Sequence, residues 1–113
     1  MPIEVRVTAE FEEWYTGLND AKQVSITRVV DMLKVLGPVL EFPYSSAIVG
    51  SRIAMRELRV KSKGDQLRIL YTFDPTRAAV LLLGGSKIGV GDRWYKTAIL
   101  HAERLYAQYR RGE

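Results

Sequence analysis

Basic side chains at alternate positions in the middle of the chain are the first candidates for chemistry. Arg59 and Lys61 belong to one stretch of alternating character, and Arg68 belongs to the next. If the turn Lys63-Gly64-Asp65 joins the two stretches as neighbouring strands, the three cations lie on one sheet face. The register decides this, because a slip of one residue inverts the face. The pattern predicts either a groove that binds phosphates or a solvated, open sheet face.

A second group of candidates follows the next apolar stretch. It comprises Lys87, Arg93, Tyr95 and Lys96, after a Gly-rich segment that leads into a helix. Such a loop can bind phosphate through backbone amides. However, the glycines have neither the spacing of a P-loop nor that of a dinucleotide fingerprint. Nucleotide hydrolysis and Rossmann-type binding are therefore excluded. The glycines, Gly84, Gly85, Gly89 and Gly91, predict a mobile loop that serves as a flexible connection.

The composition narrows the possible chemistry. The chain has 113 residues, no cysteine and one histidine, His101, so we expect neither a disulfide nor a metal centre. A hydrophobic fraction of 47% with 27% charged residues is usual for a soluble globular protein. We expect a single domain over residues 1–113. The apolar runs are too short for a membrane span and there is no signal peptide, so we expect a cytoplasmic protein.

Charge is unevenly distributed along the chain. Residues 1–51 hold four basic and seven acidic side chains, whereas residues 52–113 hold 13 basic and six acidic ones. A basic half on a small domain favours a polyanionic partner, most often a nucleic acid. The alternative is a solvated surface rich in lysine and arginine.

The elements that position these residues can be predicted from periodicity and caps. We expect an N-terminal strand over 3–7, then a helix capped by Thr8 and a second helix capped by Asp20 that ends at Gly37-Pro38. A loop over 37–53 precedes strands at about 54–61, 67–74 and 78–84, and a helix over 93–110 capped by Asp92 ends the chain. The predicted fold class is α+β, with an N-terminal strand, a helical hairpin, an antiparallel β-meander and a C-terminal helix.

Several local strings, in this order and spacing, resemble a known family. They are Gly37-Pro38, Met55-Arg56-Glu57-Leu58-Arg59, Leu67-Arg68-Ile69-Leu70-Tyr71, Gly85-Ser86-Lys87 and Trp94-Tyr95. The chain resembles the RelE/ParE superfamily of type II toxin–antitoxin toxins, and within it the phage-derived, HigB-like branch. The resemblance covers nearly the whole chain and implies a RelE-like fold.

The resemblance also implies an activity and partners. It implies a ribosome-dependent endoribonuclease that cuts translated mRNA through the 2′-hydroxyl without metal or cofactor and so inhibits translation. The implied partners are the ribosome, mRNA and a cognate antitoxin, commonly a helix-turn-helix protein, with no membrane. Arg68, Lys87 and Tyr95 match catalytic positions, and we expect RNA-binding roles for Arg59, Lys61, Arg93 and Lys96.

Departures from the family pattern leave alternatives open. Many relatives have two lysines where this chain has Ser86-Lys87, and residues 88–94 are Gly-rich. A non-nucleolytic, ParE-type gyrase poison and a nucleic-acid-binding protein of the same fold therefore remain alternatives. Helical spacing places His101 near a packed face, as a structural residue. The same spacing predicts that Phe11, Trp14 and Tyr15 pack the helical hairpin, with an antitoxin surface as the alternative.

Overall fold

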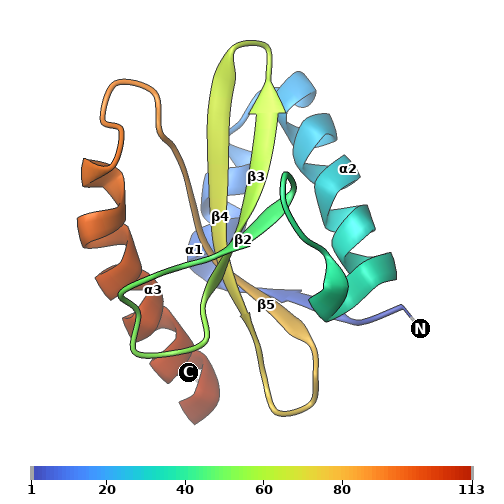
Figure 1. The fold of residues 1–113 in the computed structure, drawn as a ribbon, viewed down its shortest axis with the longest axis vertical. Helices are drawn as coiled ribbons and strands as arrows, with labels where there is room; N and C mark the ends of the chain where they lie inside the picture. Colours follow the sequence, from blue (N-terminus) through green and yellow to red (C-terminus); the bar gives the residue numbers. More distant parts are fainter. Residues whose placement is uncertain (1, 113) are drawn as a thin grey trace.

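A mixed sheet of five strands forms the centre of the molecule, as seen in a computed structural model that describes residues 2–112 (Figure 1). The strand order across the sheet is β1-β5-β4-β3-β2. None of the helices among the described residues is both long and apolar enough to cross a membrane. In chain order the elements are β1 (Val5–Val7), α1 (Ala9–Thr16), α2 (Asp20–Leu36), the 3-10 helix η1 (Gly37–Val39), β2 (Ser45–Ala47), β3 (Arg56–Ser62), β4 (Asp65–Phe73), β5 (Ala79–Ser86) and α3 (Arg93–Arg111).

The predicted fold class is confirmed, with two additions at the sheet edges. Strands β3, β4 and β5 form the expected antiparallel meander, whereas β1 pairs in parallel with β5. The prediction of a loop with a short turn over 37–53 is wrong for one segment, because Ser45–Ala47 pair with β3 as strand β2. Gly37–Val39 form η1, a single short turn. A strand of three small residues is too short to show a period, so only its partner strand reveals it.

Helix caps were predicted correctly in one case out of three. The Thr8 side chain accepts a hydrogen bond from the Phe11 amide and caps α1 as expected. Asn19, and not Asp20, caps α2, since its Oδ1 accepts from the Lys22 amide at 2.9 Å. Asp92 precedes α3 without a capping hydrogen bond from its side chain. Its carboxylate lies 3.7 Å from Lys87 Nζ instead.

Strand parity divides the apolar side chains between two cores, one on each face of the sheet. Leu58 and Val60 of β3 pack with Ile69 of β4 against α1 and α2. Leu70 of β4 faces the other way, into a second core that includes Ala98 of α3. Figure 1 shows α2 and α3 on opposite sides of β3 and β4. The helices therefore hold the sheet from both faces, and the start of α3 reaches the face that carries the predicted cations.

Two glycines assigned to a mobile loop lie inside β5, so that prediction is wrong for them. A Cβ built on Gly84 would lie 2.2 Å from the Trp14 ring, and one on Gly85 would lie 2.4 Å from the Trp94 ring. Both indoles therefore pack directly on bare backbone, one on each face of the strand. These glycines are required by close approach and not by flexibility.

Substituting Gly84 tests this packing. Gly84→Ala should lower the free energy of unfolding by about 1–3 kcal/mol, because the new methyl group overlaps the indole of Trp14 and forces it to move. Gly17→Ala is the matched control, because its Cβ would meet nothing closer than 3.6 Å. Urea unfolding followed by circular dichroism measures both, and equal stability of the two variants would contradict the packing.

A polar network joins the β4–β5 turn to both ends of the chain. The Asp74 carboxylate accepts from the Tyr109 hydroxyl at 2.7 Å, from the Thr76 hydroxyl and from Arg6. Burial alone raises the pKa of Asp74, but the hydrogen bonds from Thr76 and Tyr109 outweigh it and lower the pKa to about 2. The ionised carboxylate is therefore the form that stabilises the fold.

The depressed pKa predicts a specific acid dependence. Because the carboxyl is ionised in the folded state down to about pH 2 but has an ordinary pKa of 3.8, its contribution is complete above pH 4 and is lost as the pH falls from about 4 to about 2. The loss should amount to about 2 kcal/mol. In Asp74→Asn this segment of the pH profile should flatten, as measured by urea unfolding across that range. A parallel loss in both proteins would contradict the assignment.

Candidate functional site

A buried carboxylate lies at the centre of the predicted cationic face. We name the Glu57 cluster after it and define it as Glu57, Arg59, Arg68, Lys87 and Tyr95. Arg59 is directly opposite Arg68 in the β3–β4 register. The prediction that these two arginines share a sheet face is therefore confirmed. Both lie on the face to which α3 adds Tyr95.

Both oxygens of Glu57 accept contacts from the surrounding donors. Oε1 accepts a hydrogen bond from the Tyr95 hydroxyl and lies 3.7 Å from Arg68 Nε. Oε2 accepts from the Ser46 hydroxyl at 2.8 Å and from Arg59 Nη1 at 3.3 Å. Like charges opposite each other destabilise a sheet. The carboxylate offsets this repulsion, because it lies within ion-pair distance of both guanidinium groups.

Arg68 is the most buried cation of the cluster, with 4% of its surface exposed. Its Nη1 donates to the Leu67 carbonyl at 3.0 Å. Its Nε is buried and has no hydrogen-bond partner among the described residues. A buried donor without an acceptor costs about 1–3 kcal/mol, and such groups are rare in folded proteins. Arg68 is therefore held beside Glu57 by charge rather than by a hydrogen bond from Nε.

Tyr95 extends from the first turn of α3 and is the neutral donor of the cluster. Burial first, and then the hydrogen bond to Glu57, raise the pKa of Tyr95 to about 12, although Arg68 acts in the opposite direction. The phenol is therefore protonated at neutral pH. It can donate a proton or a hydrogen bond, but it is a poor base.

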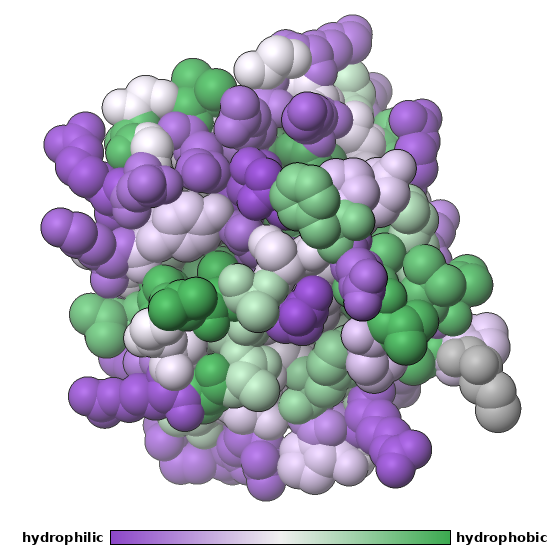
Figure 2. Space-filling model, viewed as in Figure 1, coloured by the Kyte–Doolittle hydropathy of each residue, from purple (hydrophilic) through white to green (hydrophobic). Residues whose placement is uncertain are grey.

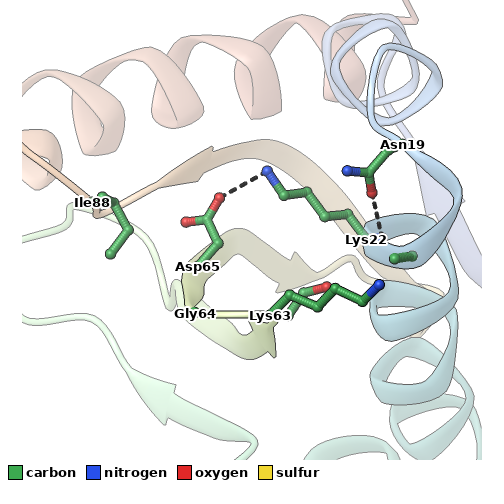
Figure 3. A pocket seen from close by; sticks show the side chains of 8 residues that line it. Asn19, Lys22, Lys63, Gly64, Asp65 and Ile88 are labelled. Carbon is green, nitrogen blue, oxygen red and sulfur yellow. Dashed lines mark hydrogen bonds and ion pairs between the residues drawn. The ribbon is translucent and has the colours of Figure 1, made fainter.

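Lys87 is held over Tyr95 by the end of β5. Its Nζ lies 5.2 Å from the centre of the Tyr95 ring, and its amide donates to the Gln66 carbonyl at 2.9 Å. The neighbouring Ser86 hydroxyl donates to Asp65, which is also 3.0 Å from Lys22 Nζ. Figure 3 shows Lys22 of α2 reaching Asp65 beside the β3–β4 turn. This network ties the hairpin, α2 and β5 together just before Lys87.

The comparisons with known proteins agree with this architecture. The family model described as "Phage derived protein Gp49-like (DUF891)" matches residues 13–107. The chain belongs to the Gp49-like family. It is 40% identical over 96 residues to a protein of Mycobacterium tuberculosis named "Putative toxin HigB3", covering 84% of this chain and 82% of that one. A second, "Putative toxin HigB2" of the same organism, is 35% identical over 107 residues, covering 90% of this chain and 53% of that one.

A solved structure shows the same fold at low sequence identity. The crystal structure of an archaeal RelE–RelB complex from Pyrococcus horikoshii OT3 matches with a TM-score of 0.59 and 14% identity. The match covers 80% of this chain and all of that one. The Gp49-like chain is thus a relative of proteins named HigB toxins and has a RelE-like fold.

The other residues predicted for RNA binding lie outside the cluster. Lys61 is exposed and lines a groove beside β3. Arg93 and Lys96 are exposed on the first turn of α3 and form no ion pair or side-chain hydrogen bond with another described residue. The structure therefore brings Arg59, Arg68, Lys87 and Tyr95 together and leaves these three at the periphery.

The residues that were expected to be structural are found in packed positions. Phe11 is buried in the first core, with Trp14 and Tyr15 packed against it. His101 is partly buried on α3, and its Nε2 lies 3.8 Å from Glu10 of α1. The predictions of core packing for the aromatic residues and of a partly buried histidine are confirmed.

Glu57 and Ser46 belong to this Gp49-like site but were not predicted. Ser46 lies in the strand that the sequence left as a loop. Glu57 offered one signal, because it is the acidic residue on a strand face that also carries Arg59 and Lys61. A single acidic side chain among basic ones on one face of a half-buried strand indicates an ion pair, but the sequence does not identify the partner.

The Tyr95–Glu57 hydrogen bond predicts a shift that can be measured. Glu57→Gln should lower the pKa of Tyr95 from about 12 toward the ordinary 10.0, because the negative charge that opposes phenol ionisation is removed. NMR titration of isotope-labelled tyrosine rings, with Tyr95→Phe to assign the signal, measures the change. Glu12→Gln, on the exposed face of α1, is the control. An unchanged Tyr95 titration in Glu57→Gln would contradict the contact.

Proposed function

We propose that this chain is the toxin of a type II toxin–antitoxin pair and cleaves mRNA on the ribosome, without a metal, through the 2′-hydroxyl. One observation carries the proposal: Arg59, Arg68 and the protonated Tyr95 contact one buried carboxylate, that of Glu57, and Lys87 lies over the Tyr95 ring. The toxin names of the M. tuberculosis relatives support the proposed role as a toxin.

The proposed reaction needs three contributions from the protein. A group must accept the proton of the 2′-hydroxyl as its oxygen attacks the adjacent phosphorus. Positive charge must stabilise the phosphorane-like transition state. A donor must protonate the 5′-oxygen as its bond to phosphorus breaks. The products are a 2′,3′-cyclic phosphate and a 5′-hydroxyl.

The Glu57 cluster contains a candidate for each contribution. Arg68 and Arg59 are permanently charged and can bind the phosphate through paired donors, and Lys87 adds a point charge. Tyr95, with its pKa of about 12, is suited to donate rather than to accept. Glu57 is the carboxylate within the cluster, and we assign it the role of proton acceptor.

Positioning by the ribosome completes the proposal. General acid–base help is worth about 10²–10⁴-fold, whereas alignment of the reacting groups can contribute about 7–11 kcal/mol. A site with modest proton-transfer groups can therefore depend on the ribosome to align the mRNA. The archaeal structural neighbour is a RelE–RelB complex. By analogy we propose a cognate antitoxin for this chain, of the helix-turn-helix class that the sequence resemblance implies.

Substitutions in the cluster should remove cleavage. Arg68→Ala and Lys87→Ala should each slow single-turnover cleavage of ribosome-bound mRNA by about 10²-fold or more, because each removes a positive charge that stabilises the transition state. Lys87 is on a partly exposed segment, so its variant should fold normally. Lys34→Ala, an exposed lysine on α2, is the matched control. Wild-type cleavage by both cluster variants would overturn the site.

Mapping of 5′ ends distinguishes the proposed function from the alternatives. After brief induction, mRNA should acquire new 5′ ends within coding regions and in register with the reading frame, and co-expression of the cognate antitoxin should restore growth. Induction of the DNA-damage response with intact mRNA would favour a ParE-type gyrase poison. RNA binding without cleavage or growth arrest would favour a plain binding protein.

A further inference from the structure

A groove adjoins the Glu57 cluster at the open edge of β3. β2 pairs only with residues 56–58 of β3, so the end of β3 near the turn is paired with β4 on one side and has no strand on its outer side. The loop between η1 and β2 and the side of α2 enclose the groove, whose volume is about 450 Å³. We call it the Phe42 groove; it is lined by Ser25, Arg28, Val29, Phe42, Pro43, Tyr44, Arg59, Val60, Lys61 and Arg68.

An aromatic ring is held out into solvent at this groove. Phe42 is 72% exposed, and the Arg59 guanidinium lies 5.2 Å from its ring centre. The loop that carries the ring is anchored on both sides, because Leu40 is buried and the Arg59 amide donates to the Tyr44 carbonyl at 2.8 Å. The ring is therefore presented to solvent from a fixed position, beside a guanidinium group.

The groove is also strongly cationic. Arg28, Arg59, Lys61 and Arg68 contribute to its lining, and no acidic residue does. Arg28 and Lys61 form no ion pair with any residue from 2 to 112. Figure 2 shows hydrophilic and apolar side chains next to each other over the η1–β2 loop and the β3–β4 hairpin. The groove thus combines unpaired positive charge with an aromatic face.

We infer that the Phe42 groove is a binding subsite for single-stranded RNA, in which one unpaired base stacks on Phe42 and the flanking phosphates lie along Arg28 and Lys61. Aromatic rings and arginine planes are the surfaces on which proteins stack unpaired bases. A volume of about 450 Å³ suits one nucleotide. The inference rests on the proposed function, because Arg59 and Arg68 belong to both the groove and the cluster. The stacked base is therefore one that flanks the cleaved bond.

Binding of a short RNA tests the stacking directly and does not need cleavage. The probe is an unstructured, fluorescein-labelled RNA with 2′-O-methyl groups, titrated with the purified full chain and followed by fluorescence anisotropy. Phe42→Ala should weaken binding about tenfold, whereas Phe42→Trp should bind within about twofold of wild type, since it keeps an aromatic face. Phe42→Leu keeps an apolar side chain without a ring and should be as weak as Phe42→Ala. Val49→Ala truncates an apolar side chain that is more exposed than Phe42, at 92%, and should change nothing.

A second arm locates the base. An RNA series with one abasic site moved along the strand should contain one position at which wild type loses about tenfold in affinity. At that position Phe42→Ala should lose nothing further, since the ring and the base act as a pair. Circular dichroism melts check that every variant folds.

Three results would overturn the inference. They are wild-type RNA affinity in Phe42→Ala, wild-type affinity in Phe42→Leu, and loss of affinity for the purified cognate antitoxin with RNA binding unchanged. The last would make the groove a protein-docking surface. None of these results bears on in-frame cleavage of cellular mRNA, which decides the proposed function separately.

Discussion

The Glu57 carboxylate is the group on which the arrangement of the site depends. The β3–β4 register places two arginines directly opposite each other, and one of them is almost fully buried. Two cations in such a position repel each other and lose hydration. Glu57 lies within ion-pair distance of both and also receives Tyr95 and Ser46. A buried carboxylate paired in this way lets the sheet hold positive charge where a polyanion could reach it.

The register that creates this pairing is set by the hairpin turn. Lys63 and Gly64 both have positive φ angles, of 47° and 84°, which suits a two-residue turn between right-twisted strands. The turn is then tied to α2 through Lys22 and Asp65. A different turn length would shift the pairing and separate Arg59 from Arg68.

The second constraint is close packing where β5 ends and α3 begins. Trp94 lies against the bare backbone of Gly85, and Tyr95 follows it into the cluster with its ring 5.1 Å from that of Trp94. The start of α3 therefore supplies the phenol, and the end of β5 supplies Lys87. Because β2 is so short, no strand pairs with the outer edge of β3 beyond Arg59, whose amide bonds to the Tyr44 carbonyl. Basic side chains of the meander and aromatic side chains of the η1–β2 loop line the same groove at this edge.

Periodicity in the sequence determined the strands of the meander, their two faces and the long helices, because alternation and helical spacing are local properties. Alternation also identified Arg59 and Arg68 as candidates, whereas Lys87 and Tyr95 were indicated by the segment before the last helix and by the family resemblance. The tertiary structure brought these four side chains together. What the tertiary structure alone decided was each contact between distant segments. Glu57 became the centre because Tyr95, 38 residues later, folds over it. Gly84 and Gly85 became packing surfaces because two indoles lie on them. Local patterns specify which face a side chain takes, but the partner it meets depends on how the whole chain closes around the sheet.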